Sequence, residues 1–217
     1  VSADEGIASL NRGGLLYDKW YKEIGEDTPT VSHSAYPADK KYAKKPGDNW
    51  RCKECHGWDY MGKDGGYASG KHSTGIKGIN GMMGADTGAI IKIMKDKTHG
   101  YTDKMDDDDL MDLANFVSKG QLDTDKYIDR ASKMPINANV ARGADIYNSV
   151  CIKCHGVDGS KPKDMDKTLA AQMSNPWEVM HKIMNGHPGQ NMPSMRAFGP
   201  QTAVDVLGHI LTLPKKK

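Results

Sequence analysis

The sequence has 217 residues, of which 37% are hydrophobic and only two are Phe. This length allows two small domains, but so few large apolar side chains predict a thin core if the core is made of protein alone. The formal net charge of +2 and the lack of any apolar run near the ~20 residues of a membrane span argue against nucleic-acid-binding and membrane-spanning proteins. The polar first residues, 1–5, are typical of a mature terminus and not of a signal peptide.

An amphipathic helix is predicted over residues 6–24. Its candidate core positions are Ile7, Leu10, Leu15, Leu16 and Tyr17. Residues 12–17 of this helix read Arg-Gly-Gly-Leu-Leu-Tyr, and residues 142–147 read Arg-Gly-Ala-Asp-Ile-Tyr. The shared order of Arg, Gly, a small residue and Tyr predicts an internal repeat. In both copies we expect the Gly to let another helix cross closely and the Tyr to pack at that crossing.

Two copies of Cys-x-x-Cys-His occur, at residues 52–56 and 151–155. This spacing is the attachment signature of c-type haem, because two thiols add across the vinyl groups of one haem and the His offers an imidazole to its iron. The predicted attachment cysteines and iron-binding histidines are Cys52, Cys55 and His56 in the first copy and Cys151, Cys154 and His155 in the second. A four-Cys zinc site and a thioredoxin-type redox pair are the alternatives, but neither needs a His at that position. Two covalent haems would also supply the missing apolar core.

The two halves differ in the distance between the repeated tyrosine and the haem motif. Tyr147 lies four residues before Cys151, whereas Tyr17 lies 35 residues before Cys52. The first half therefore carries an insertion of about 31 residues, at roughly 21–51. This insertion is rich in Pro, Lys, Asp and Tyr, which predicts a long ordered loop.

Two histidines lie in predicted loops of the first half. His33, within the insertion, is expected to be solvated rather than to bind iron. His72, within the Gly-rich loop 62–81, is expected to meet a haem propionate or solvent.

Further helices are predicted over residues 86–96 and 106–119, with His99 in the loop between them. The inward positions of the first are expected to be Ile90, Ile91, Ile93 and Met94. The second begins with four Asp, which suit the positive end of a helix dipole, and Asp106 is its expected cap. Its buried stripe is predicted to be Leu110, Leu113, Phe116 and Val117, and Gly120 should end it.

Residues 121–137 are polar and lack periodicity, which predicts a linker with a short helix near Tyr127. The second half then repeats the order of the first. It is predicted to hold a helix containing Tyr147, the second haem motif, a loop at 156–168, a helix at 175–185, a loop at 186–198 and a last helix at 200–212. Pro200 suits the first turn of that last helix.

The haem motifs, the Gly/Tyr first helix, the loop Asn191-Met192-Pro193 and the amphipathic last helix together resemble a two-domain dihaem class I c-type cytochrome. The resemblance covers most of the chain except the insertion and the linker. It implies an all-α fold of two class I cytochrome c domains, at residues 1–120 and 138–217, each a few helices wrapped round one covalent haem. It also implies a soluble periplasmic protein, because these cytochromes mature outside the cytoplasm.

In that family the second iron ligand comes from the loop before the last helix, usually as Met. Residues 105–117 align with 198–210 at an offset of 93, which places His99 on Met192. We therefore expect Met192 to bind the second haem and His99 the first, with Met195 as the rival of Met192. The alternatives to His99 are Met94 and Met105. Met ligation raises a reduction potential relative to a second His, so electrons are expected to pass from the first haem to the second.

The resemblance predicts electron transfer between periplasmic redox partner proteins. The chain would be a soluble carrier, or the cytochrome subunit of an oxidoreductase with a separate catalytic subunit, and not itself an enzyme. Candidate docking lysines are Lys44, Lys45, Lys53, Lys71, Lys77 and Lys153. The alternative hypothesis is a dihaem redox enzyme of the thiosulfate or peroxide type. That enzyme, like a sensor of small gases, would need one open iron position.

Overall fold

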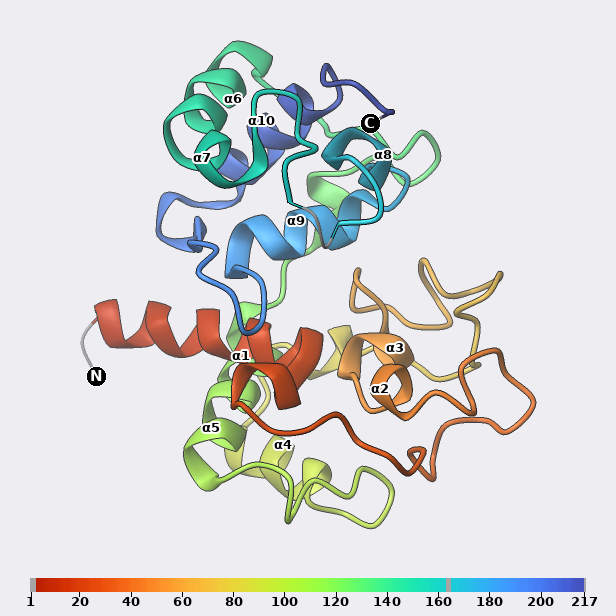
Figure 1. Cartoon of the computed structure of the whole chain (residues 1–217). Coiled ribbons are helices and arrows are strands. Elements are labelled where there is room, and N and C mark those ends of the chain that lie inside the picture. The colour runs from red at the N-terminus through yellow and green to blue at the C-terminus, as the bar shows by residue number, and fades with distance from the viewer. Residues whose placement is uncertain (1–2, 163–164, 217) are drawn as a thin grey trace. The chain divides into compact units, whose positions relative to one another are not determined.

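The computed structural model describes residues 3–162 and 165–216, so the first two residues of the polar start and part of the predicted loop 156–168 lie outside it. The described residues form helices, with two isolated bridges, Gly62 to Lys77 and Ile128 to Pro135, in place of any sheet (Figure 1). The expected all-α class is confirmed. None of the described helices is both long and apolar enough to cross a membrane.

The chain divides into two compact units. The first contains Val1–Leu122 together with Asn185–Met192, and the second contains Asp123–Met184 together with Pro193–Lys217. The segment Asn185–Met192 packs against the first unit, where the backbone N–H of Gly189 donates to the Glu23 carboxylate at 3.3 Å.

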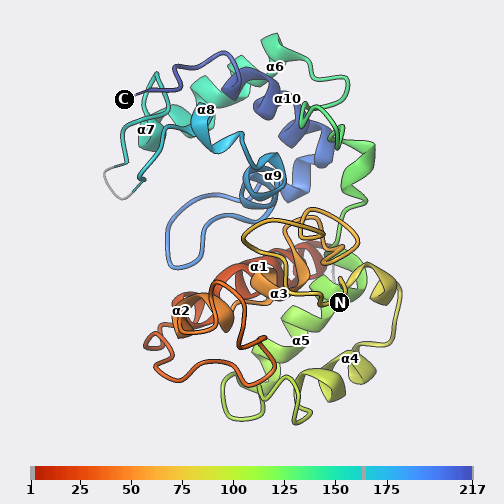
Figure 2. The same ribbon diagram turned by 90° about the vertical axis from the view of Figure 1, so that its right-hand side faces the viewer.

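The first unit is built on a crossing between α1 (Ala3–Glu23) and α5 (Asp107–Asn115), seen from two sides in Figures 1 and 2. Gly13 lies at this crossing, where an added Cβ would fall closer than 3.0 Å to the backbone oxygen of Asp112. The sequence expectation of a Gly that admits a second helix is confirmed. The helix α4 (Thr87–Met94) completes the packing against α5.

The caps and faces of these helices follow their sequences. Asp106 caps α5 in a reciprocal capping box with Asp109, and a π-helical turn, Phe116–Gly120, continues the helix to its predicted end. The whole predicted stripe along α5 and this turn is buried. In α4 the inward face is narrower than expected: Ile90 and Met94, four residues apart, are buried, but Ile93, at the flank of that face, is 41% exposed.

Residues 24–51, most of the predicted insertion, form the expected ordered loop, which also contains a four-residue helix that was not predicted, α2 (Pro46–Asn49). The chain between the two halves holds a short 3-10 helix, Thr124–Lys126, next to Tyr127 as expected. It is not a simple exposed linker, because Ile128 is fully buried.

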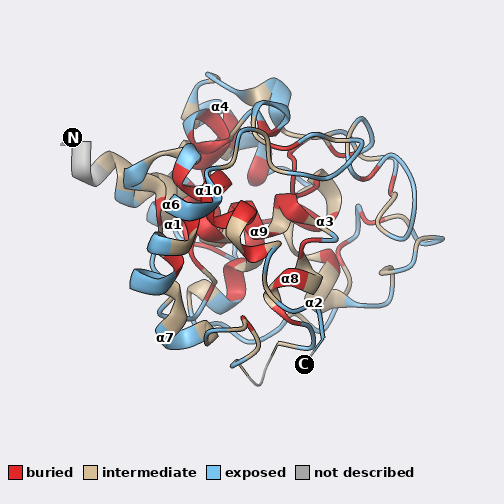
Figure 3. Ribbon diagram, turned by 90° about the horizontal axis from the view of Figure 1, so that it is seen from above, coloured by how far each residue is buried: buried red, intermediate tan, exposed pale blue. Residues whose placement is uncertain are grey.

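The second unit pairs α6 (Val140–Ile146) with α10 (Pro200–Ile210), and Pro200 occupies the first turn of α10 as predicted. α10 is buried along most of its length (Figure 3). The unit also contains α7 (Ile152–His155), the unpredicted short helix α8 (Leu169–Gln172) and most of α9 (Pro176–Asn185).

Candidate haem sites

The first haem motif forms a helix of its own, α3 (Cys52–His56), which ends at Gly57 with a positive φ of 83°. Cys52 and Cys55 are half-buried on it. Burial raises the pKa of the Cys52 thiol to about 11 and that of Cys55 to about 12, so both thiols are neutral at pH 7. All four cysteines of the chain lie among the described residues, and none forms a disulfide.

His56 is held as a neutral imidazole with one defined tautomer. Its Nδ1 lies 2.8 Å from the carbonyl oxygen of Lys77, and a carbonyl can only accept, so Nδ1 carries the hydrogen. The pKa of His56 is lowered to about 4, mainly because the ring is buried. The lone pair is therefore on Nε2. A histidine that ligates a metal commonly donates its other ring N–H to a backbone carbonyl or a carboxylate in this way.

His99 carries the same pattern with a carboxylate as its partner. Its Nδ1 lies 3.2 Å from Oδ1 of Asp96, and the same oxygen accepts the backbone N–H groups of Thr98 and His99 at 2.8 Å each. These hydrogen bonds, led by that from the His99 backbone, lower the pKa of Asp96, so its carboxylate is charged at pH 7. An ionised carboxylate only accepts, so Nδ1 of His99 carries a hydrogen, and a neutral ring with this hydrogen has its lone pair on Nε2.

The structure brings His56 and His99 together. Their ring centres are 6.4 Å apart, and their planes differ by 19°. An imidazole nitrogen binds a first-row metal ion at about 2 Å and the ring centre lies about 1 Å further out, so two rings on opposite sides of one ion have centres about 6 Å apart. Two thiols and two imidazoles with this spacing fit one covalently attached haem.

His33 is buried, although a solvated side chain is expected from the sequence. It is only 8% exposed, so the expectation of a solvated side chain is wrong. Its Nε2 lies 2.9 Å from the carbonyl oxygen of His99, and its Nδ1 accepts the backbone N–H of Ala35 at 3.2 Å. A loop histidine far away in sequence therefore touches the backbone of the candidate ligand.

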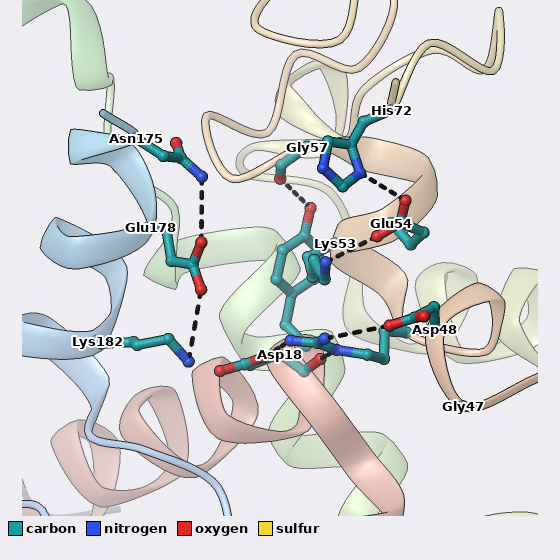
Figure 4. A network of polar contacts seen from close by, with 12 residues as sticks. Asp18, Gly47, Asp48, Lys53, Glu54, Gly57, His72, Asn175, Glu178 and Lys182 are labelled. Atoms are coloured by element: carbon teal, nitrogen blue, oxygen red, sulfur yellow. Dashed lines mark hydrogen bonds and ion pairs between the residues drawn. The ribbon is translucent and has the colours of Figure 1, made fainter. Parts of the chain in front are cut away.

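A buried charged network occupies the two middle positions of the first motif (Figure 4). Nζ of Lys53 lies 2.7 Å from one oxygen of Glu54, and Nδ1 of His72 lies 2.7 Å from the other. The His72 ring also stacks on Tyr42 and Tyr67, with ring centres 5.0 Å apart in each pair. Lys53 is 6% exposed, so its expected role in docking is wrong, because a buried ammonium cannot meet a partner. His72 contacts this carboxylate of the protein, which was not among its predicted partners.

The second motif lies on α7 and repeats the chemistry of the first. Cys151 is half-buried with a pKa raised by burial to about 11, and Cys154 is exposed. The helix again ends at a Gly with positive φ, Gly156. Met192 is half-buried in the segment that belongs to the first unit, whereas its rival Met195 is 8% exposed in the second unit. Met192 as the partner of His155 stays a prediction.

The helix crossings of the two units share the same contacts. Arg12 on α1 forms an ion pair with Asp112 on α5, and Arg142 on α6 forms one with Asp205 on α10. Gly143 repeats the position of Gly13, since an added Cβ would meet the backbone oxygen of Asp205. Asp112 and Asp205 are 93 positions apart, the same offset that aligns His99 with Met192.

The tyrosines of the two units also make equivalent contacts. The hydroxyl of Tyr17 donates to the carbonyl of Gly57 at 2.6 Å, and that of Tyr147 donates to the carbonyl of Gly156 at 2.7 Å. Each of these glycines directly follows the His of a haem motif. The first helix of each unit is therefore tied to the residue after the candidate iron ligand.

Comparisons with known proteins bear on the second half of the chain. Residues 138–210 match the family model described as cytochrome C oxidase, cbb3-type, subunit III. No curated protein matches the chain. A chain of the Kuenenia stuttgartiensis reducing HAO-like protein complex aligns in structure over 87% of this chain and 100% of its own, with 14% identity and a TM-score of 0.31, a similarity too low to show a common fold. Residues 138–210 thus contain a cytochrome c domain, which implies covalently bound haem c and a role in electron transfer.

Proposed function

We propose that the chain is a dihaem c-type cytochrome that transfers electrons between periplasmic redox partners, with one haem in each half. The observation that carries the proposal is the set of equivalent contacts in the two units. The family match covers only residues 138–210, but the first unit has the same Arg–Asp pair, the same close Gly and the same Tyr–carbonyl bond around its own Cys-x-x-Cys-His motif. These shared features support a second cytochrome c domain in the first half.

In the first half, Cys52 and Cys55 would attach the haem, and His56 and His99 would bind its iron. The assignment of His99 is supported by the 6.4 Å spacing of the rings and by the hydrogen bonds at both Nδ1 atoms. Asp96 and the Lys77 carbonyl hold the two imidazoles in the tautomer that offers Nε2.

In the second half, Cys151 and Cys154 attach the haem, and His155 and Met192 bind its iron. The assignment of Met192 is supported by the equivalent ion pairs of Asp112 and Asp205. These two residues are separated by the same offset of 93 positions that aligns His99 with Met192 in the sequence.

A bound haem of this type supplies reversible one-electron exchange at its iron. With two protein ligands on each iron, neither haem has an open position for a substrate, so the chain acts as a carrier or as the cytochrome subunit of an oxidoreductase. The Met ligand raises the potential of the second haem, which directs electrons from the first half to the second.

Counting the haems tests this proposal. The intact mass of the holoprotein, measured under denaturing conditions, should show two covalent haems. The Cys52→Ala/Cys55→Ala and Cys151→Ala/Cys154→Ala variants should each retain one, and a redox titration of the wild type should need two midpoint potentials. A single covalent haem in the wild type would refute the dihaem proposal, and a high-spin ferric haem would favour the alternative enzyme with an open iron.

A further inference from the structure

His33, in the insertion at residues 21–51, forms a hydrogen bond to the backbone of His99. Both ring nitrogens of His33 are engaged by the protein. The backbone N–H of Ala35 donates to Nδ1 at 3.2 Å, so that nitrogen carries no hydrogen. The hydrogen is therefore on Nε2, which donates to the carbonyl oxygen of His99 at 2.9 Å. Burial lowers the pKa of His33, which agrees with a neutral ring.

His33 is itself fixed in place by its neighbours in the insertion. Its backbone N–H donates to Oδ1 of Asn49 at 3.0 Å. The amide nitrogen of Asn49 donates to the carbonyls of Tyr42 and Ala43 at 2.9 and 3.2 Å, so Asn49 joins three parts of the insertion. The Nε2 donor of His33 therefore has a defined direction.

Contacts of aromatic residues join this part of the insertion to the loop that carries His99. The ring of His33 lies 4.3 Å from that of Trp50, and the indole N–H of Trp50 donates to the carbonyl of Val31 at 2.7 Å. The hydroxyl of Tyr101, two residues after His99, donates to the carbonyl of Trp50 at 2.8 Å. The insertion, through Trp50, and the loop that carries His99 thus form one packed group.

We propose that His33 is a positioning residue for His99 and that the insertion 21–51 is a clamp that keeps His99 on the iron of the first haem. The proposal rests on the proposed function, in which His99 is the second ligand. Asp96 orients the His99 ring, and His33 holds the carbonyl of the same residue. The next residue, Gly100, has a positive φ of 68°, a conformation that glycine adopts easily.

His33 is not a competing ligand in this arrangement. Its Nδ1 lone pair is used by Ala35 and its Nε2 carries a hydrogen, so binding to iron would break one of the two bonds. His56 and His99 differ because each uses Nδ1 in a hydrogen bond and keeps its lone pair on Nε2.

The test compares two variants of the holoprotein. His33→Gln keeps an N–H donor near the position of Nε2, whereas His33→Phe keeps the ring and removes the donor. Tyr36→Phe is the matched control, because it changes another buried residue of the insertion. The measurement is the rate at which carbon monoxide binds the reduced first haem, which requires that His99 leave the iron.

His33→Phe should bind carbon monoxide about five-fold faster than the wild type, the change expected when one neutral hydrogen bond that favours the closed state is lost. His33→Gln and Tyr36→Phe should stay within two-fold of the wild type. An unchanged rate in His33→Phe, or the same rise in His33→Gln, would overturn the clamp. If both His33 variants lost the low-spin spectrum as fully as His99→Ala does, His33 would be the ligand and the proposal would be wrong.

Two further measurements separate the possible failures. If His99→Ala leaves the first haem six-coordinate and low-spin, the ligand assignment fails whatever the His33 variants do. If His33→Phe does not fold, the ¹⁵N chemical shifts of His33 in the reduced wild type test whether its Nε2 is a hydrogen-bond donor. They should report a neutral ring with the hydrogen on Nε2, and a ring with the hydrogen on Nδ1 would overturn the proposal.

Discussion

The ring centres of His56 and His99 lie 6.4 Å apart, with 19° between the planes. Each ring donates from Nδ1, one to the Lys77 carbonyl and the other to the Asp96 carboxylate. A carboxylate makes an imidazole a stronger electron donor than a neutral carbonyl does. The two imidazoles proposed to bind the iron of the first haem are therefore chemically different.

Replacing the carboxylate beside His99 should change the first potential. In Asp96→Asn the acceptor becomes neutral, His99 becomes a weaker donor, and the oxidised iron loses more stabilisation than the reduced iron. We expect the potential of the first haem to rise by tens of millivolts, since a tenfold change in relative affinity for a one-electron couple is about 59 mV. A redox titration resolves the two haems, and the second midpoint serves as the internal control. A fall in the first midpoint would contradict this role of Asp96.

The helix crossings should tolerate no side chain at Gly13 or Gly143. An added Cβ would meet a backbone oxygen of the opposite helix in both cases, so each Gly→Ala variant should lose about 1–3 kcal/mol of unfolding free energy. Gly6→Ala is the matched control on α1, because no atom lies within 4 Å of its added Cβ. That variant should gain about 0.5–1 kcal/mol. Denaturant unfolding measures all three, and equal values for Gly13→Ala and Gly6→Ala would refute the close crossing.

Asp205 should make the second unit sensitive to acid. Its burial alone would raise the pKa, but hydrogen bonds from Asn139, Gln201 and Arg142 outweigh burial and lower the pKa of Asp205. A lowered folded pKa stabilises the protein above the unfolded value of about 3.9, and this contribution is lost as the pH falls through the folded pKa.

The Asp205→Asn variant tests this pH dependence. Its unfolding free energy should be below that of the wild type at pH 7, and the difference should shrink as the pH drops below about 4. A difference that stays constant from pH 7 to pH 3 would show that the charge of Asp205 does not contribute.

The Lys53–Glu54 pair should be required for the fold of the first motif. Both side chains are buried, so Glu54→Gln leaves Lys53 without its carboxylate and should cost about 3–5 kcal/mol. The double variant Lys53→Met/Glu54→Gln removes both charges and should recover part of that loss. Thermal unfolding of the holoprotein measures both, and a Glu54→Gln variant as stable as the wild type would contradict the role of the pair.

The helices of the crossings could be predicted because their apolar residues recur at helical spacing and their ends carry caps. Asp106 and Pro200 are such signals, and both occupy the predicted positions. The short helices α2 and α8 carry too few residues for a periodic pattern. Ile93 was assigned to the inner face because a run of apolar residues does not by itself define which of them point inward.

The site could be predicted only in part. The Cys-x-x-Cys-His motif itself identifies the candidate attachment cysteines and one candidate iron-binding His, and the alignment of the internal repeat identifies His99 as the other. The positions of His33 and Asp96 depend on how loops fold back, and neither belongs to a pattern of fixed spacing. Lys53 was expected on the surface because an isolated Lys is usually solvated. Its burial follows from the contact with Glu54, which the sequence gives no reason to pair with it.

The most direct test of the proposed ligation of the two haems is near-infrared magnetic circular dichroism of the oxidised holoprotein. This measurement reports the ligand pair of each low-spin haem separately. We predict one bis-His haem and one His/Met haem in equal amounts. The bis-His signal should be lost in His99→Ala and the His/Met signal in Met192→Ala, whereas Met195→Ala should keep both. A high-spin haem in the wild type, or a His/Met signal that survives in Met192→Ala and disappears in Met195→Ala, would contradict the account.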